Sequence, residues 1–325
     1  MWSSGALTDI EKAKDDASKL VVLGSAHRAG IFEALSEERD IGSLKEILNA
    51  DERALYIILE ALYAMGYVNR IGEKYVIADK ARPIFLEHGD EYVGGSLPHF
   101  MDILGAWLHL PETLKGNKPE KSSGKRDVAA FMNAMAARPG NVVEETVNHC
   151  LNRKSDAKKV LDLGGGPGKY ARAFVNKGMD VVLYDMPDAI DYVGTHFGLK
   201  DITALRLKKG DFTREGFVKE LNGESFDIVF MGNICHIYSE DENKKLVRRA
   251  RELLNNNGMI AIEDFVRGRS PIAEMFAVNM LANTESGNTY TEKQYREWLE
   301  VAGFGSIEVK DLDGNENQLI TGFPE

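Results

Sequence analysis

A glycine-rich loop directly after a short apolar run is the strongest candidate for chemistry in this sequence. The run Lys159–Leu163 leads into Gly164–Gly168, and a helical stretch begins near Lys169. Ligands of open α/β sheets bind beyond the carboxyl ends of the strands, and glycine lets the backbone approach a ligand because it has no Cβ. A nicotinamide fingerprint requires glycine at the sixth position of such a loop, where Lys169 stands. The pattern, an aspartate and then three alternate glycines, therefore predicts a site for another ligand; the alternative is a plain strand–helix turn.

Acidic residues end the next two apolar runs and support a nucleoside ligand. Asp185 follows Val181–Tyr184, and an acid at this place can accept hydrogen bonds from both hydroxyls of a ribose. Asp211 and Phe212 end the third run. An aspartate can accept the amino hydrogens of adenine, and a phenylalanine can pack on the face of the ring. Each feature alone also fits a helix cap or a surface turn, but their order along the chain makes the set specific.

One histidine follows a strand where a catalytic base would be useful. The run Phe226–Met231 predicts a fourth strand, and His236 lies a few residues beyond its carboxyl end. A phenol has a pKa near ~10, so little phenolate exists at neutral pH. A positioned imidazole can remove that proton while a group is transferred. His236 is thus the candidate general base; the alternative is a loop histidine with structural hydrogen bonds only.

Composition places the chain among ordinary globular proteins. It has 325 residues, 43% of them hydrophobic and 28% charged, with a formal net charge of −11. No apolar run approaches the roughly 18–20 residues that a membrane-spanning helix needs. Two cysteines cannot make a disulfide framework, which favours the reducing cytoplasm. The acidic balance argues against binding to nucleic acid through phosphate contacts.

The chain changes character near residue 154. After it, short β-rich runs alternate with helical stretches, which predicts a parallel sheet with crossover helices. The last two runs, Ile307–Val309 and Gln318–Thr321, have a short loop between them and predict an antiparallel hairpin at the sheet edge. Before residue 110 the pattern is helical, with β-rich runs at 67–71 and 75–77 around a glycine turn. Helices followed by a hairpin indicate a winged-helix arrangement.

These motifs together resemble the two-domain small-molecule O-methyltransferases, which include plant phenylpropanoid enzymes, hydroxyindole O-methyltransferase and bacterial polyketide-tailoring members. The resemblance covers nearly the whole chain. The segments that carry it are Asp162–Gly168, similar to the first motif of class I S-adenosylmethionine-dependent methyltransferases, Tyr184–Pro187, Gly210–Phe212, Cys235-His236, Asn288–Glu292 and Ala302–Phe304.

The resemblance implies an α/β fold with a Rossmann-like seven-strand sheet and an N-terminal, mostly helical winged-helix dimerisation domain. It implies a dimerisation domain at 1–115, linker helices at 116–153 and a methyltransferase domain at 154–325. The expected cofactor is S-adenosyl-L-methionine, and the expected acceptor is a small hydroxylated, aromatic molecule. A homodimer through the N-terminal domain is expected, and no metal ion, nucleic acid or membrane partner.

The resemblance also assigns roles to residues. His236 falls where the family places its base, and Asp264 matches the first of two acids that flank it. The residues expected to bind the cofactor are Asp162, Gly164, Gly165, Gly166, Asp185, Met186, Asp211, Phe212 and Asn233. Those expected to line the acceptor pocket are Phe131, Met135, Phe276, Asn279 and Met280, although a stripe of Met and Phe at helical spacing is more often plain core.

Four positions depart from the plant members of the family. Ile237 and Tyr238 stand where those members have Asp-Trp, and Gly232 stands where they often carry a lysine that touches the cofactor. Thr289 occupies the place of the second flanking acid. These differences indicate a microbial-type branch and leave the acceptor open.

Other functions remain as alternatives. The same fold could methylate carbon or nitrogen of a small hydrophobic metabolite. A winged-helix DNA-binding regulator is disfavoured because the helix that would enter the groove carries Asp51, Glu52 and Glu60, with Arg53 as its basic residue. A nicotinamide dehydrogenase is disfavoured by Lys169.

Overall fold

The computed structural model describes residues 4–89, 91–117, 127–137, 140–221, 223–312 and 316–325. The chain divides into two compact units, one of Met1–Gly105 with Ala129–Ala137 and one of Ala106–Val128 with Arg138–Glu325. Each unit is described by itself. Among the described residues, no helix combines the length and the apolar character needed to cross a membrane.

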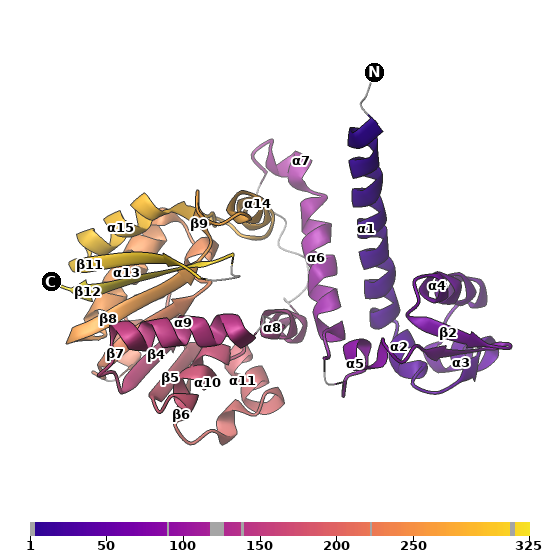
Figure 1. The fold of residues 1–325 in the computed structure, drawn as a ribbon, viewed down its shortest axis with the longest axis horizontal. Helices are drawn as coiled ribbons and strands as arrows, with labels where there is room; N and C mark the ends of the chain where they lie inside the picture. The colour runs from indigo at the N-terminus through magenta and orange to yellow at the C-terminus, as the bar shows by residue number, and fades with distance from the viewer. Residues whose placement is uncertain (1–3, 90, 118–126, 138–139, 222, 313–315) are drawn as a thin grey trace. The chain divides into compact units, whose positions relative to one another are not determined.

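The N-terminal unit is mostly helical and contains a small antiparallel sheet of strand order β1-β3-β2 (Figure 1). Helix α6 ends just beyond the boundary of this unit, and α8 begins one residue before its second segment. The elements are α1 (Ser4–Arg28), α2 (Ile31–Ala34), β1 (Arg39–Asp40), α3 (Ile41–Leu48), α4 (Glu52–Ala64), β2 (Val68–Ile71), β3 (Lys74–Ile77), α5 (Arg82–Phe85), η1 (Gly94–Ser96), α6 (Leu97–Trp107) and α8 (Val128–Ala136).

Local sequence explains the helix and hairpin in this unit. The Asp51 side chain accepts a hydrogen bond from the Ala54 N–H and so caps α4. Leu55, Leu59 and Leu62 recur at helical spacing and are buried in the core of the unit. Strands β2 and β3 pair antiparallel from Val68 opposite Ile77 to Ile71 opposite Lys74. The expected helix and hairpin are therefore present.

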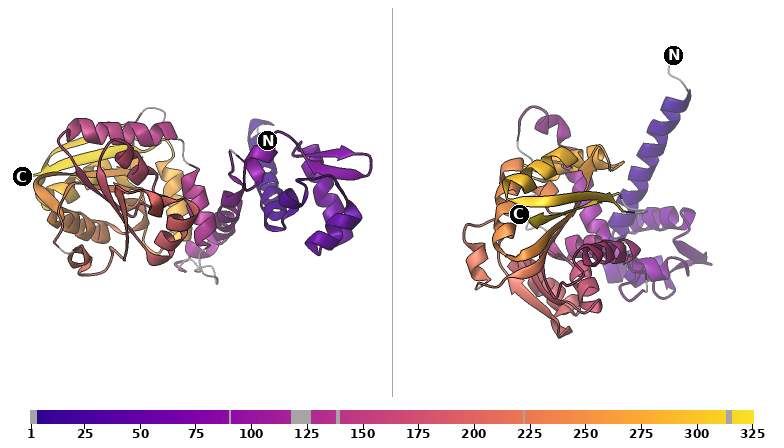
Figure 2. Two further views of the ribbon diagram at one scale, coloured as in Figure 1. Left: turned by 90° about the horizontal axis from the view of Figure 1, so that it is seen from below. Right: turned by 60° about the vertical axis from the view of Figure 1, so that its left-hand side comes forward.

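The C-terminal unit contains a seven-stranded sheet of order β11-β12-β8-β7-β4-β5-β6 (Figures 1 and 2). Its elements are α7 (Leu110–Thr113), α9 (Gly140–Arg153), β4 (Lys159–Leu163), α10 (Lys169–Asn176), β5 (Asp180–Asp185), α11 (Pro187–His196), η2 (Leu199–Asp201), β6 (Leu205–Lys209), α12 (Phe217–Glu220), β7 (Phe226–Gly232), η3 (Cys235–Ile237), α13 (Glu240–Glu252), β8 (Leu254–Asp264), β9 (Val266–Arg267), α14 (Ala273–Asn283), β10 (Tyr290–Thr291), α15 (Glu292–Val301), β11 (Phe304–Asp311) and β12 (Gln318–Pro324).

Strands β4 to β8 are parallel, so their carboxyl ends meet at one edge of the sheet. Strands β11 and β12 form the antiparallel hairpin that the sequence predicts, and β12 pairs antiparallel with β8. All seven predicted strands are present. The two-residue pair β9–β10 was not predicted, because nothing in so short a segment distinguishes it from a loop.

Helices cover both faces of this sheet. Leu161, on one face, shares a buried core with Leu246 of α13 and Trp298 of α15. On the other face, the Phe230 ring contacts Tyr170 and Phe174 of α10, with ring centroids 4.7 and 5.8 Å apart. The sheet is thus buried on both sides, as its nearly continuous apolar strands require.

Candidate active site

The glycine loop after β4 is held close to its neighbours. The Gly164 N–H donates to the Tyr184 carbonyl at 2.8 Å, and Gly164 has φ of +73°. A Cβ at this residue would lie 2.4 Å from Ile234 Cδ1 and 3.3 Å from Phe212 Cε1. At Gly166 (φ +50°) a Cβ would meet nothing within 4 Å. The loop therefore has a close-packed side, which needs glycine, and an open side, which leaves room for a ligand.

Asp185, at the end of β5, is hydrogen-bonded to this loop. Its Oδ2 accepts the Gly166 N–H at 2.8 Å, and its Oδ1 accepts the Met186 N–H at 2.7 Å. Burial raises the pKa of Asp185, and the two backbone N–H groups oppose that rise. Because a carboxylate has about four acceptor sites, Asp185 keeps capacity for the two hydroxyls of a ribose.

Asp162 lies beneath the loop without a close hydrogen-bond partner, although the Ala171 N–H acts to lower its pKa. It is 1% exposed, and neither carboxyl oxygen has a hydrogen-bond partner in the part of the chain that the structure describes. A Cβ at Gly165 would lie 2.7 Å from Asp162 Oδ2. Burial, and then the negative charge of Asp185, raise the pKa of Asp162 to about 7. A buried carboxyl without partners is costly, and it fits a site that a polar ligand completes.

The two residues of the predicted adenine motif, Asp211 and Phe212, have different surroundings in the structure. Phe212 is buried beside Gly164. Asp211 instead uses Oδ1 to accept the Thr213 N–H at 2.9 Å and the Thr213 hydroxyl at 2.6 Å. Its Oδ2 pairs with Arg214 Nε at 3.3 Å. Asp211 thus supports its own turn as well as facing this rim of the sheet.

Met186 and Asn233 flank the loop region from two different strands. Met186 precedes α11 and is 47% exposed. Asn233 follows β7 in a left-handed conformation with φ of +59°. Its N–H donates to the Glu263 carbonyl at 2.7 Å, and its Oδ1 accepts from Asn317 Nδ2 at 2.6 Å. A non-glycine residue held at positive φ indicates a position that the surrounding structure fixes tightly.

His236 and Asp264 form a buried pair at the ends of β7 and β8. His236 Nδ1 lies 2.7 Å from Asp264 Oδ1, and the His236 N–H donates to Asp264 Oδ2 at 3.0 Å. The Phe265 N–H also donates to Asp264 Oδ1, at 2.8 Å. Burial alone would raise the pKa of Asp264, but the charge and the hydrogen bonds of His236 outweigh burial, so the pKa lies below its usual value.

This pairing sets the direction of the imidazole. The Nδ1 side faces Asp264, and the ring packs against Phe276 with centroids 4.8 Å apart and against Phe265 at 5.8 Å. Nε2 has no hydrogen-bond partner among the described residues. When Nδ1 carries a proton and donates it to Asp264, Nε2 is the acceptor nitrogen. The arrangement can therefore take a proton from a group placed at Nε2.

The structure brings Phe276 to His236, but it gives Asn279 and Met280 different surroundings. Asn279 lies one turn after Phe276 on α14, and its Oδ1 accepts from Trp107 Nε1 at 3.1 Å and from Asn283 Nδ2 at 2.9 Å. Met280 is 6% exposed. Because an indole N–H can only donate, this contact fixes which atom of the Asn279 amide faces Trp107.

Phe131 and Met135, the other predicted pocket residues, lie on α8 in the N-terminal unit. The Phe131 ring meets His99 of α6 edge-on, with centroids 5.3 Å apart. Met135 is 38% exposed.

Thr289, at the place of the second flanking acid, makes structural contacts. Its hydroxyl donates to the Ala273 carbonyl at 3.1 Å and accepts from Arg267 Nε at 3.2 Å. The adjacent Asn288 N–H donates to the His236 carbonyl at 2.9 Å. The segment therefore supports the backbone at His236, and Asp264 is the carboxylate hydrogen-bonded to the His236 ring.

Sequence reasoning missed two residues of this rim. Ile234 packs on Gly164, and Phe265 packs on His236 and donates its N–H to Asp264. Each is a direct sequence neighbour of a predicted site residue, and this adjacency is the signal that could have identified it.

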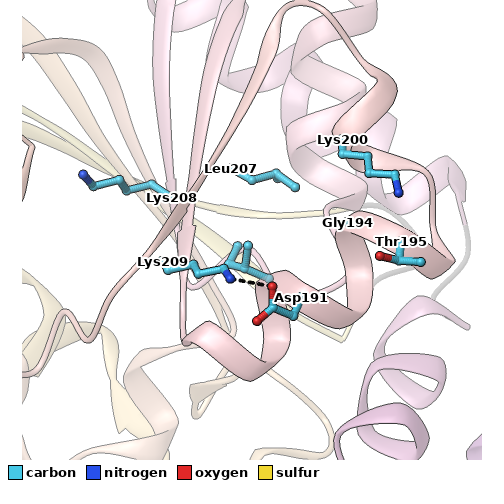
Figure 3. A pocket seen from close by; sticks show the side chains of 8 residues that line it. Asp191, Gly194, Thr195, Lys200, Leu207, Lys208 and Lys209 are labelled. Atoms are coloured by element: carbon cyan, nitrogen blue, oxygen red, sulfur yellow. Dashed lines mark ion pairs between the residues drawn. The ribbon is translucent and has the colours of Figure 1, made fainter.

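A separate surface groove lies between α11 and β6 (Figure 3). Lys200, Lys208 and Lys209 border it, and Lys209 Nζ pairs with Asp191 Oδ1 at 2.5 Å. His236 does not line this groove, which is distinct from the rim described above.

Glycine backbone and acidic side chains that suit a nucleoside share a sheet edge with a histidine directed to accept a proton. Such an edge suits an α/β enzyme that binds a nucleoside-containing cofactor. The chain belongs to the O-methyltransferase family: the model of the O-methyltransferase domain matches residues 120–305.

Individual relatives agree with this assignment. The tetracenomycin polyketide synthesis 8-O-methyl transferase TcmO of Streptomyces glaucescens is 24% identical over 302 residues, 86% of each chain. Among solved structures, an O-methyltransferase family protein from Burkholderia thailandensis matches with a TM-score of 0.81 and 18% identity, over 100% of this chain and 99% of that one. Human N-acetylserotonin methyltransferase, solved in complex with SAM, matches with a TM-score of 0.77 and 18% identity, over 100% of this chain and 99% of that one.

Proposed function

We propose that this protein transfers the methyl group of S-adenosylmethionine to a hydroxyl of a small aromatic molecule, with His236 as general base. Family membership supports the reaction class. The observation that carries the role of His236 is its 2.7 Å contact with the buried Asp264, which orients the ring and leaves Nε2 to accept a proton.

The rim of the sheet fits the proposed cofactor. The open face at Gly166, the remaining acceptor capacity of Asp185 and the apolar Phe212 beside Gly164 suit an adenosine moiety. The unpartnered Asp162 carboxyl suits a ligand with polar or cationic groups. When bound, S-adenosylmethionine supplies an electrophilic methyl group on a sulfonium.

The chain's own residues account for the proton. Asp264 holds the His236 ring by Nδ1 and stabilises the imidazolium that forms when Nε2 takes the acceptor's proton. Phe265 and Phe276 pack around the ring, which reduces its contact with water. Their aromatic edges and faces favour a flat, apolar acceptor.

The same proposal extends to assembly and compartment. We infer the domain plan of a winged-helix dimerisation region at 1–115, linker helices at 116–153 and a methyltransferase domain at 154–325, with a homodimer formed through the first region. Exposed apolar side chains on α3 and α4 (Ile47, Tyr56, Ile57 and Tyr63) support this surface. The buried thiols of Cys150 and Cys235 fit the reducing cytoplasm. Sedimentation showing a monomer at micromolar concentration would contradict the dimer.

The test of the base is single-turnover methyl transfer at saturating cofactor with wild type and His236→Ala. A radiolabelled methyl donor and a panel including 2-naphthol and 4-nitrophenol define the acceptor. We expect His236→Ala to lose about 10²–10⁴-fold in rate for 2-naphthol, and less for the more acidic 4-nitrophenol. Calorimetry should show unchanged affinity for S-adenosylhomocysteine. Equal rates in the two proteins would reject His236 as the base.

The panel also separates oxygen from carbon and nitrogen acceptors, because the position of the labelled methyl group can be read from the product by mass spectrometry. Methylation of carbon or nitrogen alone would reject the hydroxyl as the target while leaving the cofactor assignment intact.

A further inference from the structure

Asn243 is a buried asparagine in the first turns of α13, where helix formation and burial both disfavour this residue type. It is fully buried and lies four residues after the N-cap Ser239. Asparagine is among the weaker helix formers, and Asn243 Oδ1 has no hydrogen-bond partner among the described residues. A leucine would fill about the same space without burying an unpaired oxygen. The amide therefore calls for an explanation outside the helix itself.

The amide nitrogen of Asn243 makes two hydrogen bonds to the turn that carries His236. Nδ2 donates to the Cys235 carbonyl at 2.8 Å and to the Tyr238 carbonyl at 3.2 Å. A carboxamide nitrogen has two N–H groups, so each carbonyl can receive one of them. Because a carbonyl can only accept, the nitrogen and not the oxygen of the amide must face the turn. Asn243 thus bridges two residues that flank His236.

The Cys235 carbonyl belongs to the same peptide group as the His236 N–H. Asn243 binds the oxygen of this peptide, and Asp264 Oδ2 accepts its N–H at 3.0 Å. The C=O and N–H of a planar trans peptide point in opposite directions, so the peptide is held from both sides. Asp264 Oδ1 also lies 2.7 Å from the ring nitrogen Nδ1. Asn243 and Asp264 together therefore fix both the backbone and the ring of His236.

The turn η3 is too short to fix this peptide alone. It has three residues, and the Tyr238 N–H reaches the Cys235 carbonyl at 3.3 Å, in the poorer hydrogen-bond geometry of a 3₁₀ turn. Helix α13 is better anchored. A capping box of Ser239 and Glu242 begins it, and Leu246 is buried in the core of the unit. Asn243 therefore connects the turn to a firmly packed element.

We propose that Asn243 is a positioning residue for His236: its side chain fixes the Cys235–His236 peptide and thereby the place of Nε2. This inference rests on the proposed role of His236 as general base. Without the amide, Asp264 alone holds the peptide, which is then free to tilt and to carry the ring with it. A misplacement of about 1 Å can cost roughly 100-fold in the rate of a positioned reaction.

The first test observes this peptide directly in the free protein. Cys235-His236 is the one Cys-His pair in the sequence. Protein labelled with carbon-13 at the cysteine carbonyls and with nitrogen-15 in histidine therefore gives a single signal in an NMR spectrum that correlates the two nuclei. In Asn243→Leu we expect the carbonyl resonance to move upfield, because the carbonyl loses a hydrogen bond.

The matched control is Asn255→Leu, which removes an amide that donates to Asp227 Oδ1 at the amino ends of β7 and β8. It should leave the signal of the labelled peptide in place. An unmoved signal in Asn243→Leu, or an equal movement in the control, overturns the inference.

The Asn243→Leu protein should fold. The Cys235 carbonyl keeps the Tyr238 N–H, and the Tyr238 carbonyl keeps the Tyr290 hydroxyl as donors. Leucine also removes the unpaired buried oxygen. Urea unfolding checks the stability, and if this variant does not fold, the same measurements are made on Asn243→Ala.

The second test is single-turnover methyl transfer at saturating cofactor. Asn243→Leu should lose about 10–100-fold in rate for 2-naphthol, and less for the more acidic 4-nitrophenol, which depends less on the base. Calorimetry should show unchanged affinity for S-adenosylhomocysteine. A purely structural asparagine would lower the rates for both acceptors by the same factor. Equal factors, or no loss in rate, overturn the inference.

A double variant separates failure of this inference from failure of the proposed function. If Asn243 acts through His236, adding Asn243→Leu to His236→Ala should cost little further rate, whereas independent effects multiply. Full activity in His236→Ala alone rejects the proposed function. Loss of activity in His236→Ala, with a multiplied loss in the double variant, rejects only this inference.

Discussion

Asp162 and Asp264 are both buried aspartates at the ends of parallel strands, and the protein treats them in opposite ways. Asp264 accepts three hydrogen bonds from His236 and Phe265, and its pKa is lowered. Asp162 has no hydrogen-bond partner among the described residues, and its pKa is raised to about 7. The chain itself supplies the hydrogen bonds of the Asp264 carboxyl, so this carboxyl is suited to fix the orientation of another catalytic group. The Asp162 carboxyl lacks such hydrogen bonds, so it is suited to interact with a ligand.

Replacing Asp264 should produce the largest effect. Asp264→Ala leaves the buried N–H groups of His236 and Phe265 without an acceptor, so the free energy of unfolding should fall by about 3–5 kcal/mol. Urea unfolding at pH 7 measures it. Asp211→Ala, in a half-buried turn, is the control and should lose about 1 kcal/mol. A loss below 1 kcal/mol in Asp264→Ala would contradict the conclusion that the hydrogen bonds of this carboxyl within the chain stabilise the fold.

The pH dependence of stability should separate the two carboxyls by sign. Between pH 4 and 7, folded Asp162 keeps a proton that the unfolded chain has released, so this residue makes the wild type less stable as pH rises. The stability of Asp162→Asn relative to wild type should therefore increase by about 2–4 kcal/mol from pH 4 to pH 8.

Asp264 should behave in the reverse way. Its lowered pKa contributes stability above the usual carboxyl range, which is lost as pH falls through the folded-state pKa. Asp264→Asn should consequently be close to wild type at acid pH and less stable at neutral pH. Urea unfolding across this range tests both variants, and parallel curves for the two would contradict the comparison.

Replacing Asp185 tests whether the region of the glycine loop around Asp162 is a ligand site. Asp185→Ala should weaken binding of S-adenosylhomocysteine by about 1–3 kcal/mol, because the proposed hydrogen bonds to the ribose hydroxyls are lost. Isothermal calorimetry gives the affinity. Asp211→Ala should weaken binding less, since the Asp211 carboxylate already bonds Thr213 and Arg214. Equal affinity in Asp185→Ala and wild type would place the ribose elsewhere.

The two sides of the glycine loop should differ by a smaller amount. Both Gly164→Ala and Gly166→Ala place a side chain at positive φ, at a cost of about 1–2 kcal/mol in folding. Gly164→Ala should lose somewhat more, since its Cβ displaces Ile234. Gly166→Ala should mainly weaken S-adenosylhomocysteine binding, because its Cβ enters the open face. Thermal unfolding measures the loss of stability and calorimetry the loss of binding. If the two faces were assigned wrongly, Gly166→Ala would lose more stability and Gly164→Ala would lose more binding.

The parallel strand order explains why much of this site could be predicted. The glycines after β4, Asp185 at the end of β5 and His236 after β7 lie at one edge of the sheet because carboxyl ends of parallel strands share an edge. Family resemblance added Asp264 on the same edge. These residues are predictable because the strands that carry them have strong local patterns.

Contacts between distant segments could not be predicted in this way. Thr146 of α9 donates to the buried Glu263 of β8 at 2.9 Å. Such contacts depend on how helices pack on the sheet, which hydrophobic periodicity does not specify. The use of the Asp211 oxygens in its own turn was also hidden, because an aspartate at a strand end has the same local sequence in either role.

The lysines beside the groove of Figure 3 have a consequence for how the protein behaves at high concentration. Two of them, Lys208 and Lys209, lie on β6, which is the last strand of the sheet and, within the described residues, pairs only with β5. A free strand edge can recruit the same edge of another molecule, and charged side chains there oppose it. We expect Lys208 and Lys209 to oppose such pairing in concentrated protein, and neutral β-branched residues in their place to make β6 a starting point for aggregation.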